Sequence, residues 1–430
     1  LLSSDRESLR YILALGLRTL TLQTGDAYRE KIGLDDSELA VIIGSSAVQS
    51  LYNTDKKNEK QENENNSDLG SESSEEIFPD VLDYENNSYN SEFLEAVIPT
   101  EKHRKLLYAP ILVCTIDHLM SAVESTRGGH HILPSLRLMS SDLVIDEIDD
   151  FSGNDLIAIS RLVFLTGMLG RKVMLSSATI PPDLAYGLFY AYRKGYKIFC
   201  QSRNIETERV CCAWIDEFRT SLDVLSISND KESMTAFKEM HEKFIDYRCR
   251  KISESIKLRH GYIAELPEKV SISDAENLYF DSIKQNILKL HSQNCEIYSK
   301  GNRKINISCG VVRMANITPC AEFGKYLLNT DFNENVCVKS MIYHSQQILI
   351  MRHIQEKFLD DVLKRDNKKH FYYNPSIKAD IDKLPDNITD LIYVVVATPV
   401  EEIGRDHDFD WAVIEPSSFR SIIQMAGRIR

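Results

Sequence analysis

The sequence predicts an α/β fold built on parallel sheets and divided into several domains. Short apolar runs recur along the chain, and most of them lack polar alternation, as expected for strands that are buried on both faces. Stretches with helical periodicity lie between them, and such alternation is typical of parallel sheets. The 430 residues are about three times the length of a typical domain. The apolar runs are TLTL (19–22), AVII (40–43), ILVC (111–114), LVI (143–145), VML (173–175), YVVVA (393–397) and AVI (412–414).

The order of these runs predicts three regions. Residues 1–205 hold the first five runs and should form one parallel-sheet domain. Residues 206–300 are charged and mostly helical in pattern, so we expect a helical linker or insertion there. Residues 301–430 should form a second parallel-sheet domain, which begins near Ile305.

One helix of the second domain is predicted in detail, over residues 345–364. Apolar residues recur along one face of this segment, as in an amphipathic helix that packs on a core. Ser345 is a suitable N-cap, because its hydroxyl can accept a hydrogen bond from a free backbone N–H of the first turn. The predicted apolar face consists of Ile348, Met351, Ile354, Phe358 and Val362.

Composition excludes several classes of protein. Apolar residues at 43% and charged residues at 27% are ordinary for a globular chain, which excludes a fibrous or wholly disordered one. The longest apolar runs are too short to span a membrane. The first residues do not resemble a signal peptide, and we expect a chain cut from a longer one. Nine cysteines without a CxxC pair indicate reduced, cytoplasmic thiols rather than a disulfide framework or a zinc site.

The net charge of −13 is concentrated in one segment. Residues 55–95 contain 13 acidic and 3 basic residues, a net of −10, which leaves about −3 for the rest of the chain. Residues 53–95 are rich in Asn, Asp, Glu and Ser, so a disordered acidic loop is predicted there. The remaining chain is close to neutral, and net charge therefore does not exclude a nucleic-acid partner.

Two carboxylates follow the apolar run LVI directly. The sequence there is Asp146-Glu147-Ile148-Asp149. Ligands of parallel sheets bind at the carboxyl ends of the strands. Nucleotide hydrolysis requires one carboxylate that holds Mg²⁺ and another that deprotonates the attacking water. The alternative is a solvated acidic turn.

A second motif follows the next apolar run. Ser177-Ala178-Thr179 comes about 30 residues after the carboxylates, in the order of motifs II and III of superfamily 2 helicases. The hydroxyls of Ser177 and Thr179 can bond Asp149 and so couple hydrolysis to domain movement. The alternative is that the hydroxyls only cap the following helix.

Two further motifs lie near the carboxyl end. The run YVVVA leads into T-x-x-x-E-x-G-x-D, which matches motif V with Thr398, Gly404 and Asp406. Q-x-x-G-R matches motif VI with Gln424 and Arg428. Arg428 would act as an arginine finger that offers a cation to the transferring phosphate. The alternative for Arg428 is a surface salt bridge. Four ordered motifs on the expected elements identify the chain as a superfamily 2 helicase with two RecA-like domains.

The residues around the motifs resemble one family in particular. The chain reads LALGLRTLTLQTGDAYRE, PILVCTIDHLMSA, LRLMSSDLVIDEIDDF, LSSATIPP and SCGVVRMANITP, and it ends in ATPVEEIGRDHDFDWAVIEPSSFRSIIQMAGRIR. These phrases closely resemble the helicase core of the CRISPR-associated helicase–nuclease of type I-F (Ypest) systems. The resemblance implies an ATP-driven translocase that is recruited to DNA opened by an RNA-guided surveillance complex. It also implies a separate metal-dependent HD nuclease domain and a fused domain that binds the spacer-integration protein.

The resemblance also implies roles for individual residues. Asp146 would hold Mg²⁺ and Glu147 would activate water, while Asp149, Ser177 and Thr179 would couple the domains. For His344, a packed core histidine is the alternative. The residues implied to contact ATP are Gly404, Asp406, Gln424 and Arg428, and those implied to contact single-stranded DNA are Gln23, Thr24, Thr115, His344, Ser345 and Thr398.

The sequence departs from this pattern in its phosphate-binding parts. It contains no G-x-x-x-x-G-K-[ST] motif, whose backbone and Lys hold the β and γ phosphates. In the family that motif lies just upstream of residue 1, and a second arginine of motif VI would fall at position 431. We therefore expect a core truncated at both ends and inactive as an isolated ATPase. The alternatives are another superfamily 2 motor, such as an RNA helicase or a restriction translocase, and an inactive DNA-binding remnant.

Overall fold

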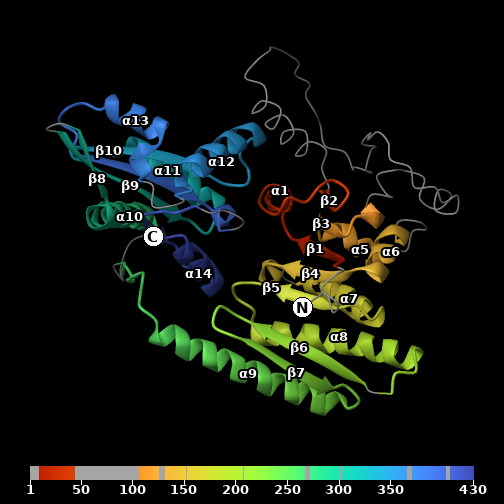
Figure 1. Ribbon diagram of the computed structural model, residues 1–430. Helices are drawn as coiled ribbons and strands as arrows, with labels where there is room; N and C mark the ends of the chain where they lie inside the picture. Colours follow the sequence, from red (N-terminus) through yellow and green to blue (C-terminus); the bar gives the residue numbers. More distant parts are fainter. Residues whose placement is uncertain are drawn as a thin grey trace, which may run out of the picture. The chain divides into compact units, whose positions relative to one another are not determined.

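The structure is a computed structural model that falls into two compact units, Leu1–Ser255 and Ile256–Arg430. Figure 1 shows the elements of both units, coloured along the sequence. The predicted acidic loop, residues 53–95, lies outside the described residues. The structure describes residues 9–43, 106–124, 131–151, 153–206, 208–266, 272–300, 303–365, 370–402 and 407–430.

Unit 1 is built on a five-stranded sheet in which every neighbouring pair is parallel. The strand order is β2–β3–β1–β4–β5, so the first strand of the chain lies at the centre. This arrangement confirms the predicted parallel α/β fold. The strands are β1 (Tyr11–Leu15), β2 (Leu39–Ile42), β3 (Ile111–Thr115), β4 (Asp142–Asp146) and β5 (Val173–Ser176).

Helices cover both faces of this sheet, which explains why its strands lack polar alternation. Leu13 and Leu15 of β1 pack on one face with residues of α1, whereas Ile12 and Ala14 pack on the other with residues of α5, α6 and α7. The helical elements are α1 (Arg18–Ala27), a π-helical turn (Tyr28–Ile32), α5 (Asp117–Glu124), α6 (Ile132–Ser140), a 3₁₀ turn (Ile148–Asp150), α7 (Asn154–Met168) and α8 (Pro182–Ser202).

The prediction of a strand at residues 19–22 is wrong. This run lies within the helix α1, and the strand is the preceding segment Tyr11–Leu15. The run TLTL alternates polar and apolar residues, which over four residues fits a strand but does not exclude a helix. The hydroxyl of Thr21 donates to the carbonyl of Leu17 at 2.8 Å, so this buried polar group is satisfied within the first turn of the helix.

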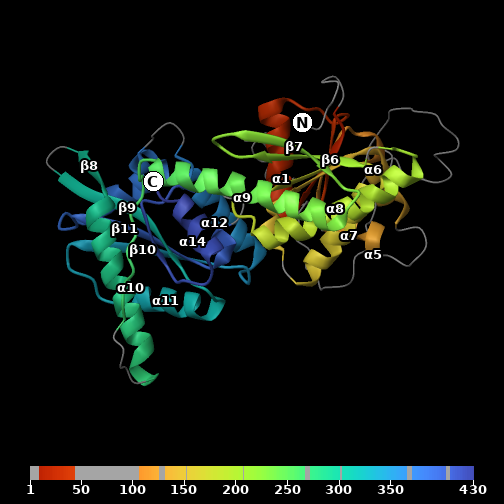
Figure 2. The same ribbon diagram turned by 90° about the horizontal axis from the view of Figure 1, so that it is seen from below.

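A hairpin and a long helix complete unit 1. The antiparallel strands β6 (Arg209–Ile215) and β7 (Thr220–Ser226) are followed by α9 (Asp230–Glu254). Trp214 and Leu225 of the hairpin pack against Phe237 of α9 and Phe189 of α8. Figure 2 shows α8 and α9 alongside the hairpin. The segment expected to be a helical insertion therefore begins with a hairpin, and its first half belongs to unit 1.

Helices α7 and α8 pack closely because of two glycines. A Cβ on Gly195 of α8 would collide with the carbonyl oxygen of Phe164 in α7, and one on Gly167 would collide with the carbonyl of Tyr192. The two helix backbones can approach this closely only where both side chains are absent.

Unit 2 contains a second parallel sheet with the order β10–β11–β9–β12, and β8 pairs antiparallel with β9 at one side. Its second parallel arrangement confirms the two-domain fold. The elements are α10 (Ile272–Asn294), β8 (Glu296–Lys300), β9 (Arg303–Arg313), α11 (Ile317–Asn329), β10 (Val336–Tyr343), α12 (Leu349–Leu363), 3₁₀ turns at Phe371–Tyr373 and Pro399–Glu401, α13 (Pro375–Asp382), β11 (Asp390–Ala397), β12 (Trp411–Ile414) and α14 (Phe419–Gly427).

The core of unit 2 lies on both faces of this sheet. Val394 and Val396 of β11 pack with residues of α10 and α11, whereas Tyr393 and Val395 pack with residues of α12, α13 and α14. Alternate residues of one apolar strand thus enter two separate cores. Within the described residues, no helix is long and apolar enough to cross a membrane. All nine cysteines are free thiols.

The predicted start of the helix at 345–364 is wrong. α12 begins at Leu349, its N-cap is Ile348, and Ser345 lies in the exposed turn before it. Ile348 and Met351 are exposed, while Leu359 and Leu363 are buried in the core. The predicted burial of Val362 is confirmed, and Leu359 and Leu363 extend the buried stripe, which lies towards the end of the helix.

Candidate active site

The adjacent carboxylates lie at the carboxyl end of a central strand. Asp146 is the last residue of β4, where it is in register with Ser176 of β5. Its Oδ1 accepts a hydrogen bond from the backbone N–H of Glu147 at 3.1 Å. Glu147 adopts a left-handed conformation with φ of 51°. Such a conformation costs a residue other than glycine roughly 1 kcal/mol or more, and it concentrates at functional sites.

The residues expected to couple the two domains contact one another. The hydroxyl of Ser177 donates to Oδ1 of Asp149, and the hydroxyl of Thr179 donates to Oδ2 of the same carboxylate at 2.5 Å. The backbone N–H of Thr179 also donates to the Ser177 hydroxyl at 3.1 Å. The turn after β4 and the turn after β5 are therefore fastened together through one carboxylate.

Asp146 fits the role of a Mg²⁺ ligand. Mg²⁺ is usually bound by one or two carboxylates, with water and substrate phosphates completing its shell. Within the described part of the chain, His, Cys, Asp and Glu side chains form no group of three or more that would hold a metal by themselves. A half-buried carboxylate at a strand end, bonded on one oxygen only to a backbone N–H, matches the phosphate-dependent type of site.

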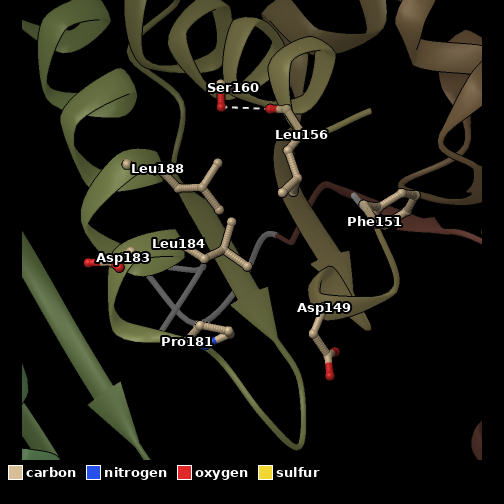
Figure 3. A pocket seen from close by; sticks show the side chains of 9 residues that line it. Asp149, Phe151, Leu156, Ser160, Pro181, Asp183, Leu184 and Leu188 are labelled. Atoms are coloured by element: carbon tan, nitrogen blue, oxygen red, sulfur yellow. Dashed lines mark hydrogen bonds between the residues drawn. The ribbon is translucent and has the colours of Figure 1, made fainter. Parts of the chain in front are cut away.

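A shallow pocket of about 450 Å³ lies beside Asp149. Figure 3 shows that Leu156, Leu184 and Leu188 converge between α7 and α8, while the carboxylate of Asp149 points away from them. The lining is mainly apolar, so this pocket suits an apolar group rather than a triphosphate.

The predicted DNA contacts of unit 1 differ in accessibility. Thr115 ends β3 and is buried, with 2% of its surface exposed. Gln23 and Thr24 lie half-buried on α1, which follows the neighbouring strand. Thr115 therefore lies at a strand end, whereas Gln23 and Thr24 lie within α1, beyond the turn that follows β1. A DNA backbone would meet the main chain around Thr115 more readily than its hydroxyl.

The predicted DNA contacts of unit 2 lie close together. β10 and β11 end side by side, because Tyr343 is in register with Ala397. The backbone N–H of Thr398 donates to the carbonyl of Tyr343 at 3.2 Å, which places His344 beside the start of motif V. Thr398 is buried, His344 is half-buried, and Ser345 is exposed.

The residues of motif VI lie on α14 and directly after it. Gln424 is half-buried on the helix, and Arg428 is its C-cap. The guanidinium of Arg428 donates to the backbone carbonyl of Glu402 at 2.8 Å. Gly404 and Asp406, the other predicted ATP contacts, lie outside the described residues.

A buried ion pair links motifs V and VI, and sequence reasoning missed it. Nε of Arg313 lies 2.6 Å from Oε1 of Glu402, and both side chains are almost fully buried. The hydroxyl of Ser421 on α14 donates to both carboxylate oxygens at 2.8 Å. The arginine at the end of the apolar segment SCGVVR could have indicated a buried ion pair, because a charge that is buried in the interior needs a partner.

A second buried cluster involves His407, which sequence reasoning also left without a role. Its Nδ1 lies 2.5 Å from Oε1 of Glu401, and its Nε2 lies 3.0 Å from Oδ1 of Asp360. Burial alone would lower the pKa of His407, but the hydrogen bonds to Asp360 and Glu401 outweigh it and raise the pKa above its usual value. This cluster fastens the end of motif V to α12.

We expect His407→Gln to destabilise the chain more at low pH than at high pH. Protonated His407 is stabilised by two carboxylates in the folded state, so its contribution is complete below its ordinary pKa and is lost as pH rises through the raised value. The loss at pH 5.5 should be about 3 kcal/mol and should shrink by pH 9. Chemical denaturation at both pH values measures it.

His291→Gln is the matched control for that measurement. His291 is also buried and bonded to a carboxylate, Asp390, but burial lowers its pKa. Its effect should therefore grow with pH instead of shrinking. Equal effects of His407→Gln at the two pH values would contradict the inferred charge state of the cluster.

Comparisons with known proteins agree along the whole chain. Residues 306–430 match the family model described as CRISPR-associated nuclease/helicase Cas3, C-terminal. The chain is 40% identical over 437 residues to the CRISPR-associated nuclease/helicase Cas3 subtype I-F/YPEST of Pseudomonas aeruginosa, with 100% of this chain covered. It is 39% identical over 436 residues to the same protein of Pectobacterium atrosepticum, again with 100% covered.

Solved structures show the same fold. T. fusca Cas3 with ADP aligns with a TM-score of 0.54 at 15% identity, and T. fusca Cas3 with ATP with a TM-score of 0.53 at 15% identity. Each alignment covers 98% of this chain and 38% of the solved chain.

Two parallel-sheet domains with ordered motifs at their strand ends define the class, the superfamily 2 helicases. Within that class the chain belongs to the CRISPR-associated Cas3 nuclease/helicases of subtype I-F/YPEST. It spans 39% and 38% of the length of the two curated relatives.

Proposed function

We propose that this chain is the ATP-driven motor segment of a single-stranded DNA translocase that acts in CRISPR interference, a cytoplasmic antiviral defence. The observation that carries the proposal is the contact of Ser177 and Thr179 with Asp149, directly after Asp146 and Glu147. This arrangement connects the turn that carries Asp146 and Glu147 to the hydroxyls of Ser177 and Thr179, which follow the next strand. The identity of about 40% to Cas3 nuclease/helicases along the whole chain supports it.

Each residue of the site has a distinct role in hydrolysis. Glu147 accepts the proton of the attacking water, and Asp146 is the residue that would hold Mg²⁺. When bound, Mg²⁺ neutralises charge on the phosphates. Arg428 offers its guanidinium to the phosphate that is transferred, and Gln424 contacts the nucleotide. Through Asp149, a change at Glu147 reaches the turn that carries Ser177 and Thr179.

The proposed track for the DNA strand consists of the ends of β3, β10 and β11 together with the helix α1. Gln23, Thr24 and Thr115 serve unit 1, while His344, Ser345 and Thr398 serve unit 2. Contacts of this kind go to phosphates and sugars, so they carry little sequence information. The unwound strand would then be degraded by an HD nuclease domain, and the RNA-guided surveillance complex and the spacer-integration protein would be partners through regions outside this chain.

DNA binding by the 430-residue chain tests the proposed track. Affinity for single-stranded DNA should exceed that for blunt duplex and should fall about 10-fold or more between 50 and 200 mM salt. Ser345→Glu should weaken binding further by about 10-fold, because Ser345 is exposed and a carboxylate there repels phosphates. Thr235→Glu on α9 is the matched control, since it adds the same charge at another exposed site. Fluorescence anisotropy with labelled DNA and RNA measures the dissociation constants, and preference for RNA would favour an RNA helicase instead.

We expect the isolated chain to hydrolyse no ATP beyond background. The sequence has no G-x-x-x-x-G-K-[ST] motif to hold the β and γ phosphates, although the carboxylates are in place. We use the term full-length protein for this chain joined to the flanking regions that its relatives possess. The full-length protein should hydrolyse ATP in a manner that depends on single-stranded DNA. A phosphate-release assay with and without DNA compares the two. Rapid hydrolysis by the isolated chain would show that another lysine holds the phosphates.

A further inference from the structure

We propose that Arg313 and Glu402 are positioning residues for Arg428, and that their buried ion pair directs the guanidinium of Arg428 towards the nucleotide. This inference rests on the proposed function, because it concerns how the arginine finger is held. None of the four motifs includes Arg313, and Glu402 is the glutamate of the motif V pattern, for which the sequence predicts no role of its own. The structure gives both a physical connection to the finger.

Glu402 contacts α14 at both ends. Its carboxylate accepts hydrogen bonds from Ser421 in the first turn of the helix, each at 2.8 Å. Its backbone carbonyl accepts from the guanidinium of Arg428, the C-cap, at 2.8 Å. A displacement of Glu402 therefore moves the start of the helix and the direction of the finger together.

Arg313 fixes the carboxylate of Glu402 in turn. It ends the strand β9 and is 2% exposed. Its three nitrogens donate in three directions: Nε to Glu402 at 2.6 Å, one terminal nitrogen to the Ser421 hydroxyl at 2.7 Å, and the other to the carbonyl of Glu415 at 3.2 Å. The planar guanidinium allows all of these bonds in one orientation, which a lysine cannot reproduce. The strand, motif V and α14 thus meet at one side chain.

The main chain of the finger is held separately from its guanidinium. The carbonyl of Arg428 accepts from the N–H of Phe409 at 2.9 Å, and the carbonyl of Gly427 accepts from the guanidinium of Arg259 at 3.3 Å. Arg259 also donates to the carbonyl of Ile429. The backbone is fixed by these bonds, and the carbonyl of Glu402 is a contact through which the side chain of Arg428 is oriented.

The burial of the pair favours a directing role over a purely stabilising one. Transferring two charges from water into the interior costs several kcal/mol per ion. The attraction between the two charges offsets this cost approximately, so a buried ion pair contributes little net stability. What it does supply is a single geometry, because either partner left alone in the interior is strongly unfavourable. A fixed geometry is what a finger needs to meet a developing charge.

The test is a double-mutant cycle on ATP turnover in the full-length protein. Glu402→Gln should lower kcat about 30-fold while the KM for ATP stays within about 2-fold, since finger contacts are made mainly in the transition state. Arg313→Met should do the same, and Arg313→Lys should recover only part of the loss. In an Arg428→Ala background, Glu402→Gln should cost less than about 2-fold more, because a positioning residue acts only through the group that it positions.

Asp410→Asn is the matched control. Asp410 forms a buried bidentate pair with Arg365 at 2.7 and 3.2 Å, and neither of these two bonds reaches Arg428. It should lower the melting temperature while kcat per folded molecule is unchanged, and its effects should be independent of Arg428→Ala. Melting curves of every variant correct for folded fraction, and Ser421→Ala serves as the milder variant if Glu402→Gln does not fold.

The outcomes separate the inference from the proposed function. DNA-dependent hydrolysis that is lost in Arg428→Ala but retained in Glu402→Gln and Ser421→Ala overturns the inference and leaves the function standing. Losses that multiply in the double variants also overturn it, because they indicate a general structural role. Absence of hydrolysis in the unsubstituted full-length protein overturns the proposed function, and the inference with it.

Discussion

Replacing Glu147 with Gln should lower ATP turnover of the full-length protein by about 10²- to 10⁴-fold, the usual contribution of a positioned general base. The amide cannot accept the proton of the attacking water, while Asp146 remains to hold Mg²⁺. Nucleotide affinity should therefore change little. Glu147 also holds a left-handed backbone at the end of β4, and Gln occupies the same volume, so the local conformation should persist. Single-turnover hydrolysis and equilibrium binding of labelled ATP measure the two effects separately.

Glu217→Gln is the control for that variant. Glu217 pairs with Arg248 on the surface of unit 1 at 3.2 Å, so the same chemical change there should leave turnover within about 2-fold. Near-normal turnover in Glu147→Gln would remove the assigned role and favour a solvated acidic turn.

Replacing Arg428 with Ala should lower kcat by about 10³-fold or more, in the range known for arginine fingers. The guanidinium supplies a cation where negative charge develops on the transferred phosphate, and alanine supplies none. Stability should fall only modestly, because the backbone of this turn is held by Phe409 and Arg259 independently of the side chain. Stopped-flow phosphate release at saturating ATP measures kcat.

Arg430→Ala provides a close comparison. Arg430 lies two residues further on and pairs with Glu296 at 2.9 Å. Its loss should change kcat by less than about 3-fold, since that ion pair is partly exposed. If the two variants lost activity equally, the effect would come from the turn as a whole and not from the guanidinium of Arg428.

The fold was largely predictable because burial on two faces leaves a clear mark on sequence. Six of the seven apolar runs are strands of the parallel sheets. A strand that lies between two layers of helices has no solvated face, so its sequence is a continuous apolar run. The prediction for residues 19–22 was wrong because four residues are too few to distinguish the period of a strand from that of a helix. The hairpin after residue 208 was missed because its residues are mixed in polarity on the exposed face, which hides a period of two.

The parts of the site that lie directly after a strand were predictable from the sequence. The parts that depend on contacts between residues far apart in the sequence were not. Asp149 and Ser177 were expected to meet because neighbouring parallel strands end at the same edge. The pair of Arg313 and Glu402 joins residues 89 positions apart, and no local pattern specifies it. The roles of all the candidate site residues, in catalysis, in ATP binding and in DNA binding, stay predictions.

The central position of β1 has a consequence for how unit 1 is synthesised. Tyr11 is in register with Ile111 on one side and with Asp142 on the other, so both neighbours of this strand leave the ribosome about 100 and 130 residues later. At roughly 5–20 residues per second, the apolar strand waits about 7–26 s for its second neighbour. During that interval its edges have no partner in the finished sheet. The nascent chain is thus open to mispairing at this strand until β4, with Asp146 at its end, has emerged.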